Sequence, residues 1–187
     1  MWSVGTTEIE TDRLVLRRFA EGDIKQVYFN FGGDPLVNRY ISFSPCSTIT
    51  GARAFILDHL KIYDINADFY SWAITLEGQI IGYISLFDVD VDSESAELGY
   101  SIGSRWWGQG YATEAAEAVL DFAFRTVRMH RVQATYHPDN IASKRVLEKV
   151  GMRFEGIQRE AQRNSDGTYS DLCMCSILLS EYVDHRR

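Results

Sequence analysis

The chain of 187 residues carries 26 Asp and Glu against 19 Lys and Arg, a formal net charge of −7 at pH 7. This balance argues against a nucleic-acid partner, because duplex binding depends on clustered Lys and Arg. With 45% hydrophobic and 24% charged residues, the composition is typical of a globular protein, and we expect one domain over residues 1–187.

The cysteines and histidines suggest neither disulfides nor a metal site. Cys46, Cys173 and Cys175 form no C-x-x-C pair, and the first residues lack a signal-peptide pattern, so we expect a reducing, cytoplasmic compartment. The four histidines show no metal-ligand spacing, and no metal is predicted. No apolar stretch approaches the ~20 residues of a membrane span, so no membrane partner is expected either.

Hydrophobic spacing predicts an alternation of strands and helices. Residues 40–45 are predicted as a loop or a short element. Because a helix separates the strands over 98–102 and 131–136, we expect these two strands to be parallel neighbours. The elements predicted in chain order are a strand over 11–19, helices over 21–31 and 48–65, strands over 69–76, 79–91 and 98–102, a helix over 112–124, a strand over 131–136, a helix over 139–150, and strands over 154–162 and 169–179.

Residues 97–116 contain the strongest local signal, a strand that runs through a loop with three glycines into a helix. Such a loop directs free backbone N–H groups and the positive end of the helix dipole at one point, which suits a phosphate. A tight strand-to-helix turn without a ligand explains the same glycines. The rest of the chain decides between the two readings.

A second motif lies where the next strand meets its helix. The loop motif, Arg105-x-x-Gly108-x-Gly110, is followed by Asn140-x-x-Ser143 and the glycine turn at Gly151. Together these motifs resemble the GNAT superfamily of N-acetyltransferases, closest to the branch that includes ribosomal-protein N-terminal (alanine or serine) acetyltransferases. The resemblance runs from residue 13 to residue 171. It implies an α/β fold of the α+β type, with a mixed, twisted seven-stranded sheet that splays between strands four and five and about four flanking helices.

The resemblance implies acetyl-CoA as co-substrate and assigns the residues that bind it. Backbone groups of the fourth strand would pair with pantetheine, and the loop and helix start would hold the pyrophosphate. Asn140 and Ser143 would lie near the thioester; Asn140 also suits a helix N-cap. The binding residues implied in this way are Tyr100, Ser101, Ile102, Gly103, Arg105, Gly108, Gln109, Gly110, Tyr111, Ala112, Thr113, Asn140 and Ser143. Arg105 also reads as an ordinary surface cation.

Catalysis requires a base for the amine and hydrogen-bond support for the departing thiolate. Glu97 is the candidate base, although a structural salt bridge or hydrogen bond explains it equally well. Glu160, on the final hairpin, is a candidate substrate-site residue and a weaker second candidate for the base. Many relatives carry a tyrosine seven residues after the asparagine, where it serves as the acid. Leu147 occupies that position here, so Ser143 is the remaining catalytic candidate for that role.

We therefore predict an enzyme, an acyl-CoA-dependent N-acetyltransferase that transfers acetyl from acetyl-CoA to a primary amine by direct attack on the thioester. The first choice of acceptor is the N-terminal α-amino group of a protein, and a small amine such as an amino acid, polyamine or aminoglycoside is the alternative. A non-catalytic acyl-CoA-binding regulatory module remains open because Leu147 replaces the tyrosine. A homodimer is a further option that the sequence leaves open.

Overall fold

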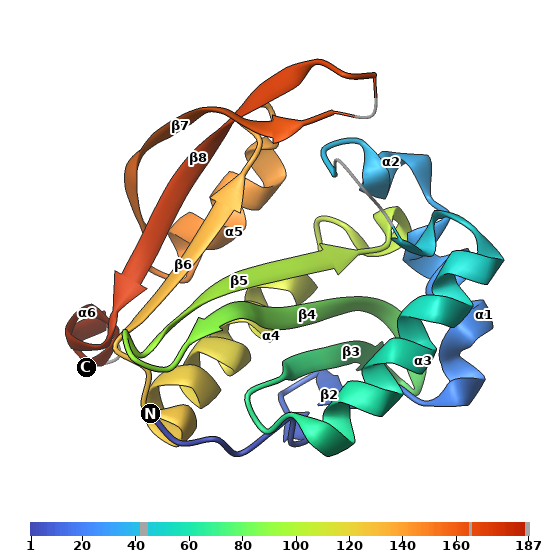
Figure 1. Cartoon of the computed structure of the whole chain (residues 1–187), viewed down its shortest axis with the longest axis horizontal. Helices are drawn as coiled ribbons and strands as arrows, with labels where there is room; N and C mark the ends of the chain where they lie inside the picture. The colour runs from blue at the N-terminus through green and yellow to red at the C-terminus, as the bar shows by residue number, and fades with distance from the viewer. Residues whose placement is uncertain (42–44, 165, 186–187) are drawn as a thin grey trace.

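The computed structural model describes residues 1–41, 45–164 and 166–185. Residues 42–44 of the predicted loop over 40–45 lie outside the described part. The helices and strands, shown in Figure 1, are β1 (Ile9–Glu10), β2 (Leu14–Arg17), α1 (Ile24–Val27), α2 (Pro35–Asn38), α3 (Ile49–Ile65), β3 (Tyr70–Leu76), β4 (Gln79–Asp90), β5 (Ser95–Ile102), α4 (Tyr111–Asp121), β6 (Arg131–Tyr136), α5 (Ile141–Lys149), β7 (Arg153–Arg163), β8 (Tyr169–Leu178) and α6 (Leu179–His185).

The described strands form one sheet of eight, in the order β1-β2-β3-β4-β5-β6-β8-β7. All neighbours are antiparallel except β5 and β6, which are parallel as predicted. The sequence predicted seven strands, and the eighth is the edge strand β1. Only Ile9 and Glu10 form it, paired with Leu16 and Val15, and two residues are too few to show an alternation.

Local sequence explains where several elements begin and end. The Thr48 hydroxyl accepts the N–H of Gly51 at 3.0 Å, so α3 begins directly after this cap. Asp34 caps α2 in the same way through the N–H of Leu36, with Pro35 in the first turn. Glu77 and Gly78 have φ values of 50° and 79°, the positive pair that a two-residue hairpin turn requires.

Two predicted helices differ from regular α-helix. The helix predicted over 21–31 is a 3-10 turn (Glu21–Asp23), then α1, then a π-helical turn (Tyr28–Gly32). The helix predicted over 112–124 is α4 followed by a second π-helical turn (Phe122–Val127). Hydrophobic spacing does not separate these forms, because each keeps the same apolar side chains turned toward the core.

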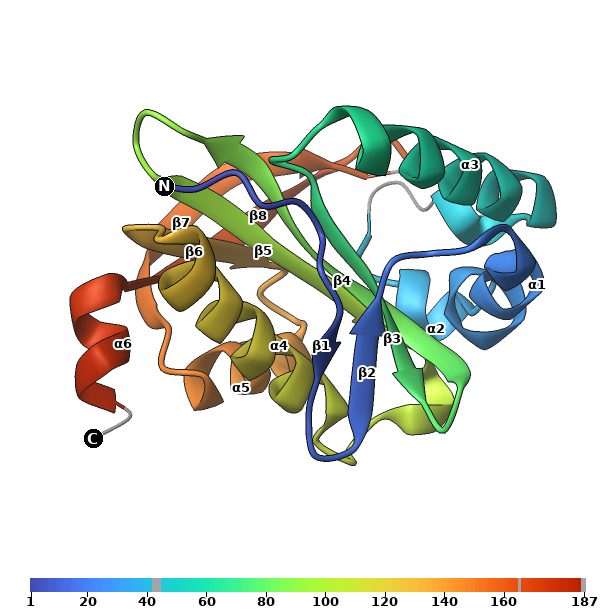
Figure 2. The same ribbon diagram turned by 90° about the horizontal axis from the view of Figure 1, so that it is seen from below.

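Helices cover both faces of the sheet, as Figure 2 shows. One face carries α4 and α5, and its buried core includes Trp72, Leu120 and Phe124. The other face carries α1 and α3, with a smaller core that includes Ile56 and Ile80. The outer half of that second face, beside β6 and β8, is left uncovered by these helices (Figure 1). The candidate site lies where β5 and β6 meet.

Candidate functional site

Strands β5 and β6 pair over only three residues and then diverge. The paired positions are Ser95 with Arg131, Ala96 with Val132, and Glu97 with Gln133. Beyond them β5 continues through residues 98–102 and β6 through residues 134–136, with no pairing between the two. We call these diverging segments the split. Backbone groups on the edges of a split sheet are free to pair with an extended ligand.

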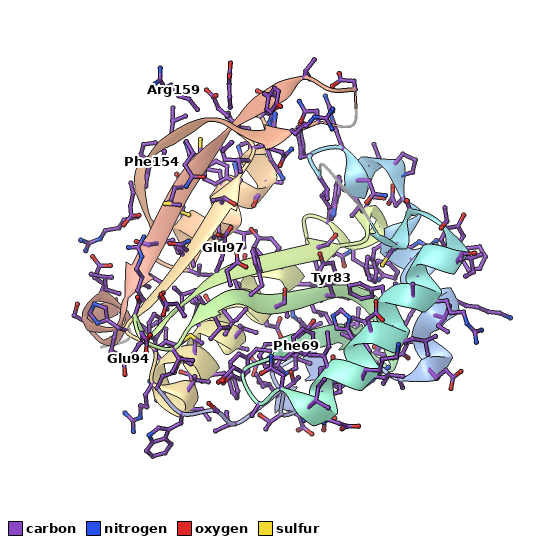
Figure 3. The ribbon with its side chains drawn as sticks, in the orientation of Figure 1. Phe69, Tyr83, Glu94, Glu97, Phe154 and Arg159 are labelled. Atoms are coloured by element: carbon purple, nitrogen blue, oxygen red, sulfur yellow. The ribbon has the colours of Figure 1, made fainter. Side chains whose placement is uncertain are left out.

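Glu97 lies at the vertex of the split, where the last pair forms, and its side chain is seen between the two strands in Figure 3. The Thr135 hydroxyl donates to its Oε1 at 2.7 Å, and Gln133 Nε2 donates to its Oε2 at 3.3 Å. Both donors belong to β6, so the carboxylate of a β5 residue is oriented from across the split. Each carboxylate oxygen keeps capacity to accept another hydrogen bond. The group can therefore accept a proton directly or through water.

An aromatic ring lies beside this carboxylate. Phe87 of β4 is the register partner of Glu97, and a Cβ at Gly99 would lie 2.8 Å from the Phe87 ring. The ring therefore rests on the bare backbone of Gly99, and the Phe87 side chain stays 41% exposed. An exposed ring next to a carboxylate gives the site one apolar wall. No motif in the sequence marks Phe87 as a site residue, although its pairing with Glu97 follows from the register of the β4–β5 hairpin.

The glycine loop has the backbone that close approach of a ligand needs. Gly108 and Gly110 have φ values of 76° and 85°, and a Cβ at Gly108 would meet nothing within 4 Å. Gly110 is the N-cap of α4 and supplies no side-chain cap, so the first-turn N–H groups of this helix remain open to an anion. The Arg105 guanidinium lies 5.3 Å from the centre of the Trp106 ring. These residues fit a pyrophosphate group.

Two residues distant in sequence hold this loop against the sheet. Glu114 of α4 accepts hydrogen bonds from the Thr11 hydroxyl at 2.6 Å, the Arg13 backbone N–H at 2.9 Å and Arg13 Nε at 2.7 Å. Arg13 Nη1 in turn donates to the Gln109 carbonyl at 3.0 Å, and its guanidinium lies 4.5 Å from the Tyr111 ring centre. We call Thr11, Arg13 and Glu114 the loop brace. None of the three was predicted as a site residue.

The second motif begins α5 on the same side of the sheet. Asn140 Oδ1 accepts the N–H of Ser143 at 3.1 Å, which makes Asn140 the N-cap. The Ser143 hydroxyl lies 3.0 Å from the hydroxyl of Tyr100, which comes from β5. Leu147, where a tyrosine was expected from the resemblance, is buried with 2% exposure. The structure thus brings the two motifs together through Tyr100.

Two other sequence-predicted positions need qualification. The N–H of Gly103 donates to the Ile81 carbonyl at 2.8 Å. Because alternate residues of an antiparallel pair bond to the neighbouring strand, Ser101 also faces β4, and the backbone donors open to pantetheine are those of Tyr100 and Ile102. Glu160 lies at an irregularity of β7 with φ 51°, and its N–H donates to Asp171. Its side chain is exposed and makes no hydrogen bond or ion pair within the described residues, so the structure does not join Glu160 to Glu97.

An aromatic contact that sequence spacing could not reveal lies at the outer end of β6. The Tyr40 ring stacks on His137, with centroids 5.1 Å apart and planes at 28°. Gln162 of β7 donates to the Tyr40 carbonyl at 3.4 Å. The segment after α2, the β6–α5 loop and β7 therefore meet beside the uncovered face of the sheet.

The family follows from a match to known sequences. Residues 13–153 match the family model described as acetyltransferase (GNAT) domain. The chain belongs to the GNAT family. It is 29% identical over 175 residues to an uncharacterized N-acetyltransferase p20 of Bacillus licheniformis, covering 92% of this chain and 97% of that protein.

Two further comparisons concern acceptor and co-substrate. An alanine N-acetyltransferase of ribosomal protein uS5 from Escherichia coli is 32% identical over 111 residues, 59% of this chain and 57% of that protein. The Microcin C7 self immunity acetyltransferase MccE, in complex with acetyl-CoA and AMP, shares the fold with a TM-score of 0.80 at 19% identity, covering 90% of this chain and 93% of that one.

The predicted fold and enzyme class are therefore confirmed. GNAT enzymes are N-acetyltransferases that use acetyl-CoA as co-substrate. Within residues 1–41, 45–164 and 166–185, no helix is long and apolar enough to cross a membrane. The same ranges contain no group of three or more His, Cys, Asp or Glu placed to hold a metal ion.

Proposed function

We propose that this GNAT enzyme acetylates the N-terminal α-amino group of a protein or peptide, at the split between β5 and β6. The observation that carries this proposal is the carboxylate of Glu97, oriented at the vertex of the split by Thr135 and Gln133. The partial likeness to an enzyme named for ribosomal protein uS5 alanine supports an α-amino acceptor. We also propose that the enzyme acts in the cytoplasm.

The acetyl-CoA co-substrate would lie on the two motifs. We assign its pyrophosphate to the glycine loop and the start of α4, where open N–H groups and glycines with positive φ admit phosphate oxygens. Pantetheine would pair with the free edge of β5, which ends at the loop. The residues assigned to acetyl-CoA as a whole are Tyr100, Ile102, Arg105, Gly108, Gln109, Gly110, Tyr111, Ala112, Thr113, Asn140 and Ser143. The thioester supplies the activated acetyl group.

Glu97 serves in this proposal as the base that removes a proton from the attacking amine. Deprotonating the amine before it attacks costs about 1 kcal/mol at pH 7 for an α-amino group but ~4.6 kcal/mol for a lysine side chain, from their reference pKa values. An α-amino acceptor thus needs only modest help from a carboxylate. Thr135 and Gln133 hold the carboxylate in one orientation, and Phe87 is its cross-strand neighbour on β4.

A panel of acceptors tests this assignment. Purified enzyme with acetyl-CoA would be offered peptides with free N-termini, the same peptides with blocked N-termini and an internal lysine, and small amines, while thiol release is followed. We expect turnover on free N-termini only. Turnover confined to small amines would contradict the peptide acceptor. Calorimetric binding of acetyl-CoA without acetylation of any amine would instead favour the non-catalytic binding module.

A further inference from the structure

The face of the sheet that carries Glu97 changes from covered to open along β4. Tyr83 and Phe87 are four residues apart on this strand, so their side chains share one face. Tyr83 packs against Phe31 and Phe55, with ring centroids 5.8 Å apart in each pair. Phe87 keeps 41% exposure and is part of neither core of the described chain. Figure 3 shows Tyr83 beside α3 and Glu97 further along the sheet, clear of that helix.

The exposed ring of Phe87 and the carboxylate of Glu97 occupy this open face together. The two residues are cross-strand partners, and opposed side chains of an antiparallel pair have Cβ atoms roughly 5 Å apart. The ring edge rests on the bare backbone of Gly99, where a Cβ would lie 2.8 Å from it. Gly99 is two positions after Glu97 and therefore faces the same way. The open face thus presents a phenyl ring next to the candidate base.

The two sides of Glu97 differ in polarity. On the β6 side, Thr135 and Gln133 donate hydrogen bonds to the two carboxylate oxygens. On the β4 side, the register partner is the apolar Phe87. Met174, the register partner of Thr135, lies on β8, two strands away from β5. An apolar group brought up to Glu97 therefore finds an apolar contact on the β4 side, whereas on the β6 side it would cover polar, hydrogen-bonded side chains.

An amino-terminal acceptor brings its first side chain close to this ring. Its ammonium group carries a positive charge that the Glu97 carboxylate attracts. The nitrogen and the Cβ of a first residue are both bonded to the same Cα, so they lie roughly 2.5 Å apart. Neighbouring strands are about 4.8 Å apart. With the amine at Glu97, the first side chain consequently starts within one strand spacing of Phe87.

We propose that Phe87 is a specificity-determining residue, which contacts the side chain of the acceptor's first residue and selects an apolar side chain of leucine or methionine size. This inference rests on the proposed function. Alanine and serine are too short to bury much apolar area against the ring. An acidic first residue would bring a like charge to Glu97 and is selected against. The acceptor class is therefore a protein or peptide that begins with a large apolar residue.

The test compares peptides that differ only in the first residue, which is Leu, Met, Ala or Asp. With saturating acetyl-CoA, thiol release gives kcat/KM for each peptide. We expect Leu and Met to exceed Ala by about tenfold and Asp to fall below Ala. Phe87→Ala should reduce the ratio of Leu to Ala to about twofold or less, and Phe87→Tyr, which keeps the ring, should preserve it. Because both peptides are measured with one enzyme preparation, a partial loss of folded enzyme cancels in the ratio.

Two further variants serve as matched controls. Val91→Ala removes an apolar side chain that is 50% exposed at the tip of the β4–β5 hairpin. Met174→Ala removes the apolar side chain beyond Thr135. Both should keep the wild-type ratio of Leu to Ala. A ratio near one in the wild-type enzyme, or an unchanged ratio in Phe87→Ala, overturns the proposal. Loss of the preference in Met174→Ala instead of Phe87→Ala also overturns it, because the first side chain would then lie on the β8 side.

Leucinamide and alaninamide, measured in the same way, keep this inference apart from the proposed function. If the enzyme acetylates these amides but no peptide, the peptide acceptor is refuted while the ratio of the two amides still decides the role of Phe87. If peptides are acetylated without regard to the first residue, the role of Phe87 is refuted and the proposed function stands. If no amine is acetylated, both are refuted.

Discussion

Replacing Glu114 should both destabilise the fold and weaken CoA binding. Glu114→Ala removes the acceptor of the Thr11 hydroxyl and of the Arg13 backbone N–H, together with the ion pair between Arg13 Nη2 and Glu114 at 2.6 Å. The Arg13 side chain is 46% exposed, so the ion pair contributes less than about 1 kcal/mol to the free energy of unfolding. The other two hydrogen bonds contribute about 1 kcal/mol each. We expect the free energy of unfolding to fall by about 2 to 3 kcal/mol.

The effect on CoA follows from the link to the glycine loop. Without Glu114, Arg13 loses the partner that orients its guanidinium toward the Gln109 carbonyl. The loop must then be ordered by the ligand, and we expect CoA affinity to fall about tenfold, or about 1.4 kcal/mol. Urea unfolding and calorimetric titration with CoA measure the two quantities. Glu117→Ala, an exposed position on the same helix, is the control for loss of one negative charge.

The pH dependence gives a third measurement of the same brace. Burial alone would raise the pKa of Glu114, but its hydrogen bonds with Thr11 and Arg13 outweigh burial and lower it. A carboxylate with a lowered pKa stabilises the fold above its unfolded value, about 4.3, and this contribution disappears as the pH falls through the folded value. The stability gap between wild type and Glu114→Ala should therefore close in acid. If Glu114→Ala unfolds and binds CoA as Glu117→Ala does, the loop brace has no such role.

Three other predictions concern the base, the loop entrance and the half-buried His59. Glu97→Gln should lower the rate of acetyl transfer at pH 7 about 100-fold, and the rate should recover as the pH rises and the amine deprotonates unaided. A pH–rate profile like that of wild type would show that Glu97 is not the base. Gly103→Ala should cost about 2 kcal/mol in urea unfolding because its Cβ would collide with the Asn30 carbonyl, whereas Gly156→Ala, with nothing within 4 Å, should cost far less. Burial lowers the pKa of His59, so its neutral form stabilises the fold above about pH 6.5, and this contribution is lost as the pH falls below that value. His59→Gln should therefore reduce the change in unfolding free energy between pH 7 and pH 5. An unchanged pH dependence would contradict this role of His59.

The elements that sequence predicted well are those with a local cause. The strand over 131–136 was predicted with the bounds that β6 has, and α3 begins where the Thr48 cap places it. The π-helical turns were missed because a widened turn keeps the apolar spacing of a helix. Gly32, at the end of one of these turns, also makes a contact that local spacing does not reveal, because a Cβ there would collide with Cys46, 14 positions further along the chain.

The parts of the candidate site that could be predicted are likewise those with a local signal in the sequence. The glycine loop and the Asn140 cap are short motifs, each contained in a few residues. Thr135 was missed, yet it follows from parallel pairing: once Gln133 stands opposite Glu97, alternation puts Thr135 on the same face. The loop brace has no such signal. Arg13 and Glu114 are 101 positions apart, and nothing in the spacing of either residue points to the other.

The narrow pairing between β5 and β6 bears on the order in which the molecule folds. Strands β1 to β5 lie side by side in chain order, and β6, β8 and β7 form a second group that is contiguous in sequence. Only three register pairs join the two groups within the sheet. Each group can form its own pairings before the other is in place, because β3–β4, β4–β5 and β7–β8 each share seven register pairs while the junction has three. We therefore expect the two groups to dock late, so that Glu97 acquires its orienting partners at one of the last steps of folding.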